Sequence, residues 1–595
     1  MSTKAQQRRD SEEFPPHVLR EYALLADGQR GALIGPRGDI AWMCMPRWDS
    51  GAVFSSLIGG GGKFAVTPST NRFVWGGYYE DATLIWRSRW VTTSRILESR
   101  EALAFPGDAH TAVVLRRVVA LDQPADVDVV LDPRADFGSR RMRRLSCDEG
   151  VWTARCGTLY MRFLGAPSAE VDHDGALRAH LEVAPGAPHD LVLELSDEPL
   201  RGAPLDPDRA WAATGTAWQR AVPPISGTIA DGDVRQSYAV LRGLTSPGGG
   251  MVAGATMSLP ERVGQGRNYD YRYAWIRDQS YAGEAVAACG AHPLLDDAVS
   301  FVSERILADG PRLKPAYTIT GGPVPGERSL DLAGYPGGAD KVGNWANEQF
   351  QLDAFGEALS LFAAAARLDR LDTVHWRAVE AAVAAIRACR MEPDAGIWEL
   401  DERRWAHSRL SCVAGLRAVA SAAPARQGSE WTSLADSILA DVSADCLHPS
   451  GRWQRAPGDD RVDAALLIPA IRGALPADDP RTVATLAGIL EGLAQDHFMY
   501  RFRHDQRRLG EAEGAFLLCG FMTSLALHRQ GREVEAGRWF ERNRAACGPP
   551  GLYSEEYDTT QRQMRGNLPQ AFVHALMMET ARALADPWTG PRRRD

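Results

Sequence analysis

The periodicity of the hydrophobic residues changes once along this chain of 595 residues, and no other feature constrains the fold as strongly. From about Tyr22 to Leu195, hydrophobic and polar residues alternate in short segments separated by Gly, Pro and Asp, as in 127–131, 159–164 and 191–195. Alternation with a period of two is typical of strands that bury one face. So many strands without long helical runs between them predict an antiparallel β-sandwich.

Beyond about Asp233 the hydrophobic spacing becomes helical, for example at Phe355, Leu359 and Phe362. About a dozen stretches follow this period. Such helices can pair and close into an α/α toroid, although an α-solenoid would give the same pattern. The predicted fold class is therefore multidomain, β followed by α.

Four segments are expected along the chain. They are a flexible N-terminal segment (1–20), a β-sandwich domain with a connecting linker helix (21–225), a helical domain (226–588) and a flexible tail (589–595). The linker is indicated by Pro- and Asp-rich residues 201–208, followed by a segment that contains Trp211 and Trp218.

The composition excludes several classes of partner. A net charge of −9 argues against nucleic acid or an anionic membrane as a partner, because both attract basic surfaces. The sequence has no apolar run long enough to span a bilayer and no secretory h-region at its start. We therefore expect a cytoplasmic protein that binds a small polar or neutral ligand.

The run from Asn268 to Asp278 contains four aromatic residues, two arginines and two aspartates. Aromatic rings stack on the apolar face of a pyranose, while Arg and Asp form charge-assisted hydrogen bonds with its hydroxyls. The run therefore indicates a sugar site, with Tyr269, Trp275, Arg277 and Asp278 as candidates. The same residue types also fill packing seams between helices.

Hydrolysis of a glycosidic bond ordinarily needs two carboxyl groups, one protonated and one ionised. Glu399 follows Trp398, a large apolar neighbour that would raise the pKa of the carboxyl by desolvation and keep it protonated. Glu555 adjoins Glu556 and two tyrosines, a more polar setting that suits a carboxylate. Taken singly, each glutamate would more often be a solvated surface charge.

Motifs along nearly the whole chain resemble those of glycoside hydrolase family fifteen, which includes bacterial glucoamylases, glucodextranases and trehalases of the mycobacterial type. They are 21–25, 40–50, 268–278, 343–344, 348–353, 396–399, 407–408, 513–516, 554–558 and 566–572.

The resemblance implies an N-terminal β-sandwich followed by an (α/α)6 barrel that carries an inverting, exo-acting α-glucosidase site. Glu399 would be the general acid and Glu555 the general base. Inversion needs room for a water molecule, which predicts carboxyl groups about 6.5–9.5 Å apart. Arg277 and Asp278 would hold the 4- and 6-hydroxyls of the terminal sugar. Other residues expected to bind substrate are Tyr269, Trp275, Lys341, Asn344, Trp398, Arg501 and Glu556.

One loop departs from the pattern of the family, which usually has two arginines between the positions of Tyr335 and Gly343. This chain has Pro336–Lys341 there and is one residue shorter, so that only Lys341 matches a basic position. Lysine is a point charge and cannot reproduce the bidentate fork of arginine. The preference for the leaving group is therefore open.

Three functions are weighed. Release of β-glucose from α-glucan oligosaccharides ranks first, and hydrolysis of α,α-trehalose with the same two glutamates ranks second. The third is a non-catalytic carbohydrate-binding or regulatory protein, which would have no need of both Glu399 and Glu555.

No cofactor and no metal are required, although calcium could bind through backbone oxygens, and homo-oligomer formation is left open. Gly59–Lys63 is no phosphate loop, because Phe64 stands where Ser or Thr is needed.

Overall fold

The structure is a computed structural model that describes residues 14–290, 292–505 and 507–587. Most of the predicted N-terminal segment and all of the predicted tail, 589–595, lie outside the described residues. Of the N-terminal segment, residues 14–20 are described, and the side chains of Phe14 and Leu19 are buried there.

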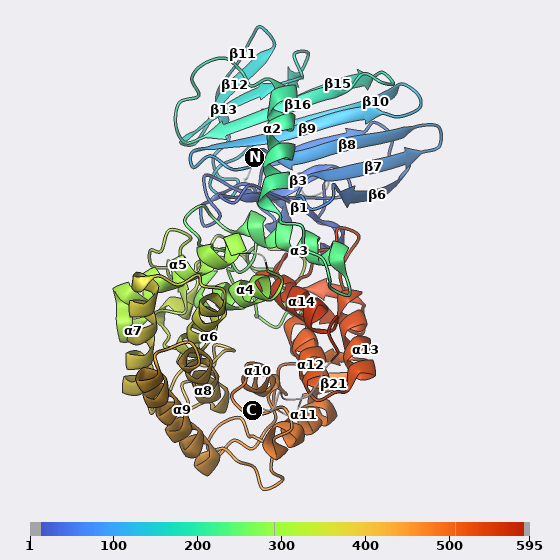
Figure 1. The fold of residues 1–595 in the computed structure, drawn as a ribbon. Coiled ribbons are helices and arrows are strands. Elements are labelled where there is room, and N and C mark those ends of the chain that lie inside the picture. Colours follow the sequence, from blue (N-terminus) through green and yellow to red (C-terminus); the bar gives the residue numbers. More distant parts are fainter. Residues whose placement is uncertain (1–13, 291, 506, 588–595) are drawn as a thin grey trace.

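The first part of the chain forms two antiparallel sheets that pack face to face (Figure 1). One sheet has the order β1(Ala23–Ala26), β2(Gly31–Ile34), β3(Asp39–Cys44), β5(Lys63–Pro68), β10(Ala125–Asp132), β15(Leu177–Val183) and β14(Glu170–Val171), with β4(Ala52–Phe54) also beside β3. The other has the order β11(Met142–Asp148), β12(Val151–Cys156), β13(Leu159–Leu164), β16(His189–Ser196), β9(Thr111–Ala120), β8(Ile96–Leu103), β7(Trp86–Thr92) and β6(Phe73–Tyr79).

The alternating sequence explains this sandwich. In β15, every second residue from Leu177 to Val183 is buried and those between are exposed. Successive side chains of a strand point to opposite faces, so the apolar set meets the inner face of the partner sheet. Phe64 and Phe163 meet there edge to face, with ring centroids 5.7 Å apart. The predicted antiparallel β-sandwich is confirmed.

The second part of the chain is helical and follows the connecting helix α2(Pro207–Ala221) (Figure 1). An inner ring consists of α4(Ile276–Ala288), α6(Asp353–Arg367), α8(Ala406–Ala420), α10(Ile468–Ile471), α12(Leu517–Arg529) and α14(Ala571–Ala583). An outer layer consists of α3(Asp231–Leu244), α5(His292–Asp309), α7(Thr373–Cys389), α9(Ala425–Asp445), α11(Pro480–Leu493) and α13(Glu533–Arg544).

The inner ring is closed. Each inner helix packs against the next one along the chain, and α14 packs back against α4. A solenoid would leave its first and last helices apart, so closure selects the (α/α)6 barrel, as predicted. Small residues permit the close packing between α6 and α8. A Cβ atom on Gly415 would lie only 2.2 Å from the backbone oxygen of Gly356.

The two domains are joined through buried polar contacts as well as apolar packing. The indole nitrogen of Trp42, on β3, donates a hydrogen bond of 2.8 Å to the backbone oxygen of Ala255, in the loop after α3. Arg272 reaches in the opposite direction and donates to the backbone oxygens of Trp48 and Ser50. Within the described part of the chain, no helix has both the length and the apolar character needed to cross a bilayer.

Candidate active site

A cavity lies at the end of the barrel where the inner helices begin. Its wall comes mainly from segments that precede α4, α6, α8, α12 and α14. The residues that line it are Ala253, Glu261, Arg267, Tyr269, Tyr271, Trp275, Arg277, Asp278, Trp345, Ile397, Trp398, Glu399, Arg501, Phe516, Glu555, Gln570 and Phe572. The fold thus brings both candidate catalytic glutamates, 156 positions apart in the sequence (555 − 399), into one cavity.

Glu399 lies in the turn between Trp398 and α8, with its side chain 18% exposed. Its Oε1 accepts a hydrogen bond of 2.9 Å from the indole nitrogen of Trp275 and lies 3.9 Å from Nη2 of Arg277. Burial raises the pKa of Glu399, against the opposing effect of Arg277. The backbone of Glu399 is left-handed, with φ of 55°, a strained conformation of the kind that gathers at functional sites. This environment suits a carboxyl group that must hold a proton.

Glu555 lies directly before strand β24(Glu556–Asp558), and its Oε1 accepts a hydrogen bond of 2.7 Å from the Tyr271 hydroxyl. As the sequence predicts, the surroundings of the Glu555 carboxyl are polar. Glu555 is only 2% exposed, so it has little contact with bulk solvent. Burial and then the negative charge of Glu261 raise the pKa of Glu555, whereas the bond from Tyr271 favours the ionised form. A Cβ atom at position 566 would lie 2.7 Å from Oε2 of Glu555, so Gly566 leaves this oxygen room.

Arg277 and Asp278 lie in the first turn of α4 and form part of the buried cavity wall. Arg277 donates a hydrogen bond of 3.0 Å from Nη1 to Oε1 of Gln351, but its Nε has no partner among the described residues. The same holds for Oδ1 of Asp278, whose pKa burial raises to about 7. Buried polar atoms in proteins are nearly always paired. These unpaired atoms therefore fit the hydroxyls of a bound sugar.

Aromatic rings make up much of the remaining wall. Tyr269 and Tyr271 are parallel, with ring centroids 6.3 Å apart, and Tyr271 meets Trp275 edge to face at 5.6 Å. Trp398 meets Phe516 edge to face at 5.4 Å and donates from its indole nitrogen to Oδ1 of Asp463. The rings are thus fixed in orientation, which is what a stacking surface for a sugar requires.

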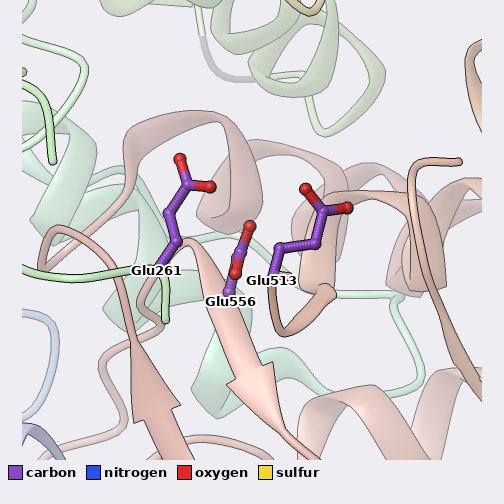
Figure 2. A group of neighbouring side chains, drawn as sticks. All are labelled: Glu261, Glu513 and Glu556. Atoms are coloured by element: carbon purple, nitrogen blue, oxygen red, sulfur yellow. The ribbon is translucent and has the colours of Figure 1, made fainter. Parts of the chain in front are cut away.

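Arg501 is the centre of a buried charge cluster. Glu261, Glu513 and Glu556 lie close together (Figure 2). One carboxylate oxygen of each lies within 4.8 Å of the others. Nη2 of Arg501 contacts all three carboxylates, at 2.9, 2.5 and 3.2 Å respectively. Arg267 and His504 join the same cluster. The three glutamates could form a cation site by their chemistry, but the cation that they bind is the Arg501 guanidinium.

Three of the predicted binding residues lie off the described cavity wall. Lys341 is half-exposed, and its Nζ is 2.6 Å from Oε1 of Glu327. Asn344 is buried and caps the short helix η4(Trp345–Glu348) with its side-chain oxygen. Glu556 accepts from the backbone nitrogen of Gly514. Glu555 directly precedes the strand that begins at Glu556, and of these two residues only Glu555 lines the cavity.

The charged residues of the aromatic run, 268–278, occupy two different environments, which the sequence does not distinguish. Arg277 and Asp278 line the cavity, whereas Arg272 and Asp270 are not wall residues and form a fully buried ion pair of 2.7 Å between Nη2 and Oδ2. Arg277 and Asp278, the two charged candidates named from this run, thus lie on the cavity wall, whereas the other two charged residues do not.

Several wall residues were not among those predicted. Tyr271 belongs to the aromatic run, so its neighbours were a signal that could have found it. Glu261 and Arg267 lie in segments without a motif, and Trp345 lies between the motifs 343–344 and 348–353 but belongs to neither.

Residues 234–582 match the family described as Glycosyl hydrolases family 15, and residues 13–201 match the family described as Trehalase-like, N-terminal. Proteins described as trehalases are similar over nearly their whole length. That of Mycobacterium tuberculosis is 30% identical over 95% of this chain and 89% of its own, and that of Mycolicibacterium smegmatis is 29% identical over 95% and 90%.

A solved structure with the same fold is a bacterial glucoamylase complexed with acarbose, with a TM-score of 0.71. The match covers 96% of this chain and 95% of the other at 15% identity, so it speaks for the fold alone. The family match spans the whole helical ring and contains both cavity glutamates. The chain is an O-glycosyl hydrolase and belongs to glycosyl hydrolase family 15.

Proposed function

We propose that this protein is an inverting hydrolase that cleaves α,α-trehalose into two glucose molecules. The observation that carries the proposal is similarity to proteins described as trehalases over 95% of the chain, including its β-sandwich domain. On the sequence alone, hydrolysis of α-glucans ranks first. The whole-length relatives favour the second alternative, and the glucoamylase resemblance at 15% identity carries no information about substrate.

The cavity offers the groups that this reaction needs. The Glu399 carboxyl would donate its proton to the bridging oxygen as the bond between C1 and that oxygen breaks. The Glu555 carboxylate would take a proton from a water molecule as the water oxygen bonds to C1 from the opposite face. Glu399 is then ionised and Glu555 protonated, and solvent exchange restores both. Tyr271, which donates to Glu555, would fix the carboxylate that aligns the water.

The stereochemistry of the products tests this proposal. Trehalose, maltose, maltotriose, isomaltose and isomaltotriose are supplied separately, and the glucose anomers are resolved by NMR before they interconvert. We expect equimolar α- and β-glucose from trehalose and little release from the others. Efficient release of β-glucose from maltotriose with none from trehalose would instead establish the glucan hydrolase, and two α-glucose molecules from trehalose would contradict inversion.

The pH profile of kcat/KM gives a second test of the site. Because Glu555 must be ionised and its pKa is raised by burial and by Glu261, the ascending limb is expected above the ordinary range of a glutamate. Glu261→Gln removes a negative charge, lowers the pKa of Glu555 and should move this limb to lower pH. The control is Glu304→Gln, whose side chain is 66% exposed. An unchanged limb in Glu261→Gln would show that another group governs it.

A further inference from the structure

Trp345 stands apart from the other aromatic residues of the cavity. It lines the wall, yet 39% of it is exposed, whereas Trp275 and Trp398 are buried. Every other tryptophan in the described part of the chain is buried or half-buried. An exposed indole costs hydrophobic free energy that burial would recover. Its place on the wall indicates that a ligand, rather than the protein, covers this ring.

The backbone beneath Trp345 is fixed. Nδ2 of Asn344 donates to the backbone oxygen of Asp270, at 3.1 Å, and its Oδ1 accepts from the backbone nitrogen of Ala346, at 2.8 Å. The Gly343 nitrogen donates to Oδ2 of Asp270. Ala346 is buried in a small apolar cluster that also contains Trp275. The indole itself has no hydrogen bond or ring contact with the described residues, so a fixed backbone holds a ring that is partly exposed at the cavity wall.

The position of Trp345 relative to Arg277 and Asp278, which lie deep in the cavity, determines which sugar ring it would contact. Arg277 and Asp278 are 6% and 2% exposed and form the closed part of the cavity. Trp345 is its most exposed aromatic residue and therefore lies toward the mouth. If the cleaved glucose fills the closed part, the sugar that leaves lies nearer the mouth. The adjacent loop supplies no cation to that sugar, because Lys341 is paired with Glu327.

We propose that Trp345 is the specificity-determining platform for the leaving sugar, stacking on its apolar face. This inference rests on the proposed function, since it assumes a disaccharide with one glucose on each side of Glu399. Stacking of this kind is roughly worth a threefold to tenfold change in affinity. It acts on binding of the second sugar and leaves the chemistry at Glu399 and Glu555 unchanged.

The experiment compares a substrate that has a leaving sugar with one that has none. Kinetic constants are measured for trehalose and for α-glucosyl fluoride, whose leaving group is fluoride, with Trp345→Ala and Trp345→Phe. The matched control is Tyr78→Ala, which removes an aromatic ring that is 46% exposed on β6 of the sandwich. Thermal unfolding of each variant shows whether the fold is retained.

We expect Trp345→Ala to raise KM for trehalose about threefold to tenfold, with a smaller change in kcat and none for α-glucosyl fluoride. Trp345→Phe should recover most of the loss. Equal effects on both substrates, or none on either, would overturn the proposal. If the enzyme hydrolyses another disaccharide of the panel instead of trehalose, the same comparison is made with that disaccharide. A failure of the trehalase assignment is thus separated from a failure of the platform.

Discussion

Glu399→Gln and Glu555→Gln should each lower kcat for trehalose by about two to four orders of magnitude, with the fold retained. Glutamine has nearly the shape of glutamate but neither donates a proton as an acid nor accepts one as a base. These are the largest effects on activity that we expect, because each variant removes a group that acts in the bond-breaking step. Glu402→Gln, an exposed glutamate three residues from Glu399, is the matched control.

The two variants should differ in a way that assigns their roles. Fluoride needs little protonation to leave, so Glu399→Gln should retain much of its activity on α-glucosyl fluoride. Glu555→Gln should lose activity on both substrates, because activation of the water is needed in either case. Circular dichroism and thermal unfolding verify the fold. Near-normal hydrolysis of trehalose by either variant would remove that residue from the mechanism, and the reverse pattern on the fluoride would exchange the two roles.

Arg272→Met is expected to cause the largest loss of stability, about 3–5 kcal/mol in the free energy of unfolding. Arg272 is fully buried and pairs through two nitrogens with Asp270. It also donates to the backbone oxygens of Trp48 and Ser50, so one guanidinium joins the barrel to the sandwich. Removal of the cation leaves the Asp270 carboxylate buried without its counter-charge, and it leaves the two backbone oxygens without this donor.

The measurement is chemical unfolding followed by circular dichroism, with Arg426→Met as the control. The Arg426 side chain is 95% exposed and pairs with Glu430 on one helix turn, an interaction worth under about 1 kcal/mol. Arg272→Lys should recover only part of the loss, because lysine lacks the planar fork. A Met substitution at Arg272 that costs no more than the control would show that the pair does not stabilise the contact between the domains.

Loss of Arg272 should also affect substrate binding in the cavity. The Asp270 carboxylate accepts a hydrogen bond from the backbone nitrogen of Gly343, and the Asp270 backbone oxygen accepts one from the side chain of Asn344. The pair of Arg272 and Asp270 therefore supports the loop that carries Trp345. We therefore expect Arg272→Met to weaken binding of trehalose even under conditions where the variant is folded. An increase in KM that exceeds that of Arg272→Lys would be the sign of this coupling.

The class of the fold could be predicted from the sequence. Alternation with a period of two in segments such as 177–183 and helical spacing beyond Asp233 each reflect which side chains must be buried, and burial depends on local periodicity. The resemblance of ordered motifs also indicated the two glutamates whose catalytic roles stay predictions. Local sequence could not separate a barrel from a solenoid, because closure depends on the contact between α14 and α4.

Which charged residues share a cavity could not be predicted, because it depends on how the chain folds in three dimensions. Arg272 and Arg277 are five positions apart in one run, yet one joins two domains and the other lines the cavity wall. Glu555 and Glu556 are neighbours, yet Glu555 lines the cavity and Glu556 pairs with Arg501. Glu261 reaches the wall from a segment without a motif, and Trp345 reaches it from between two motifs. The cause is the same in each case: a side chain's partners are set by long-range packing, which the order of residues along a short segment does not encode.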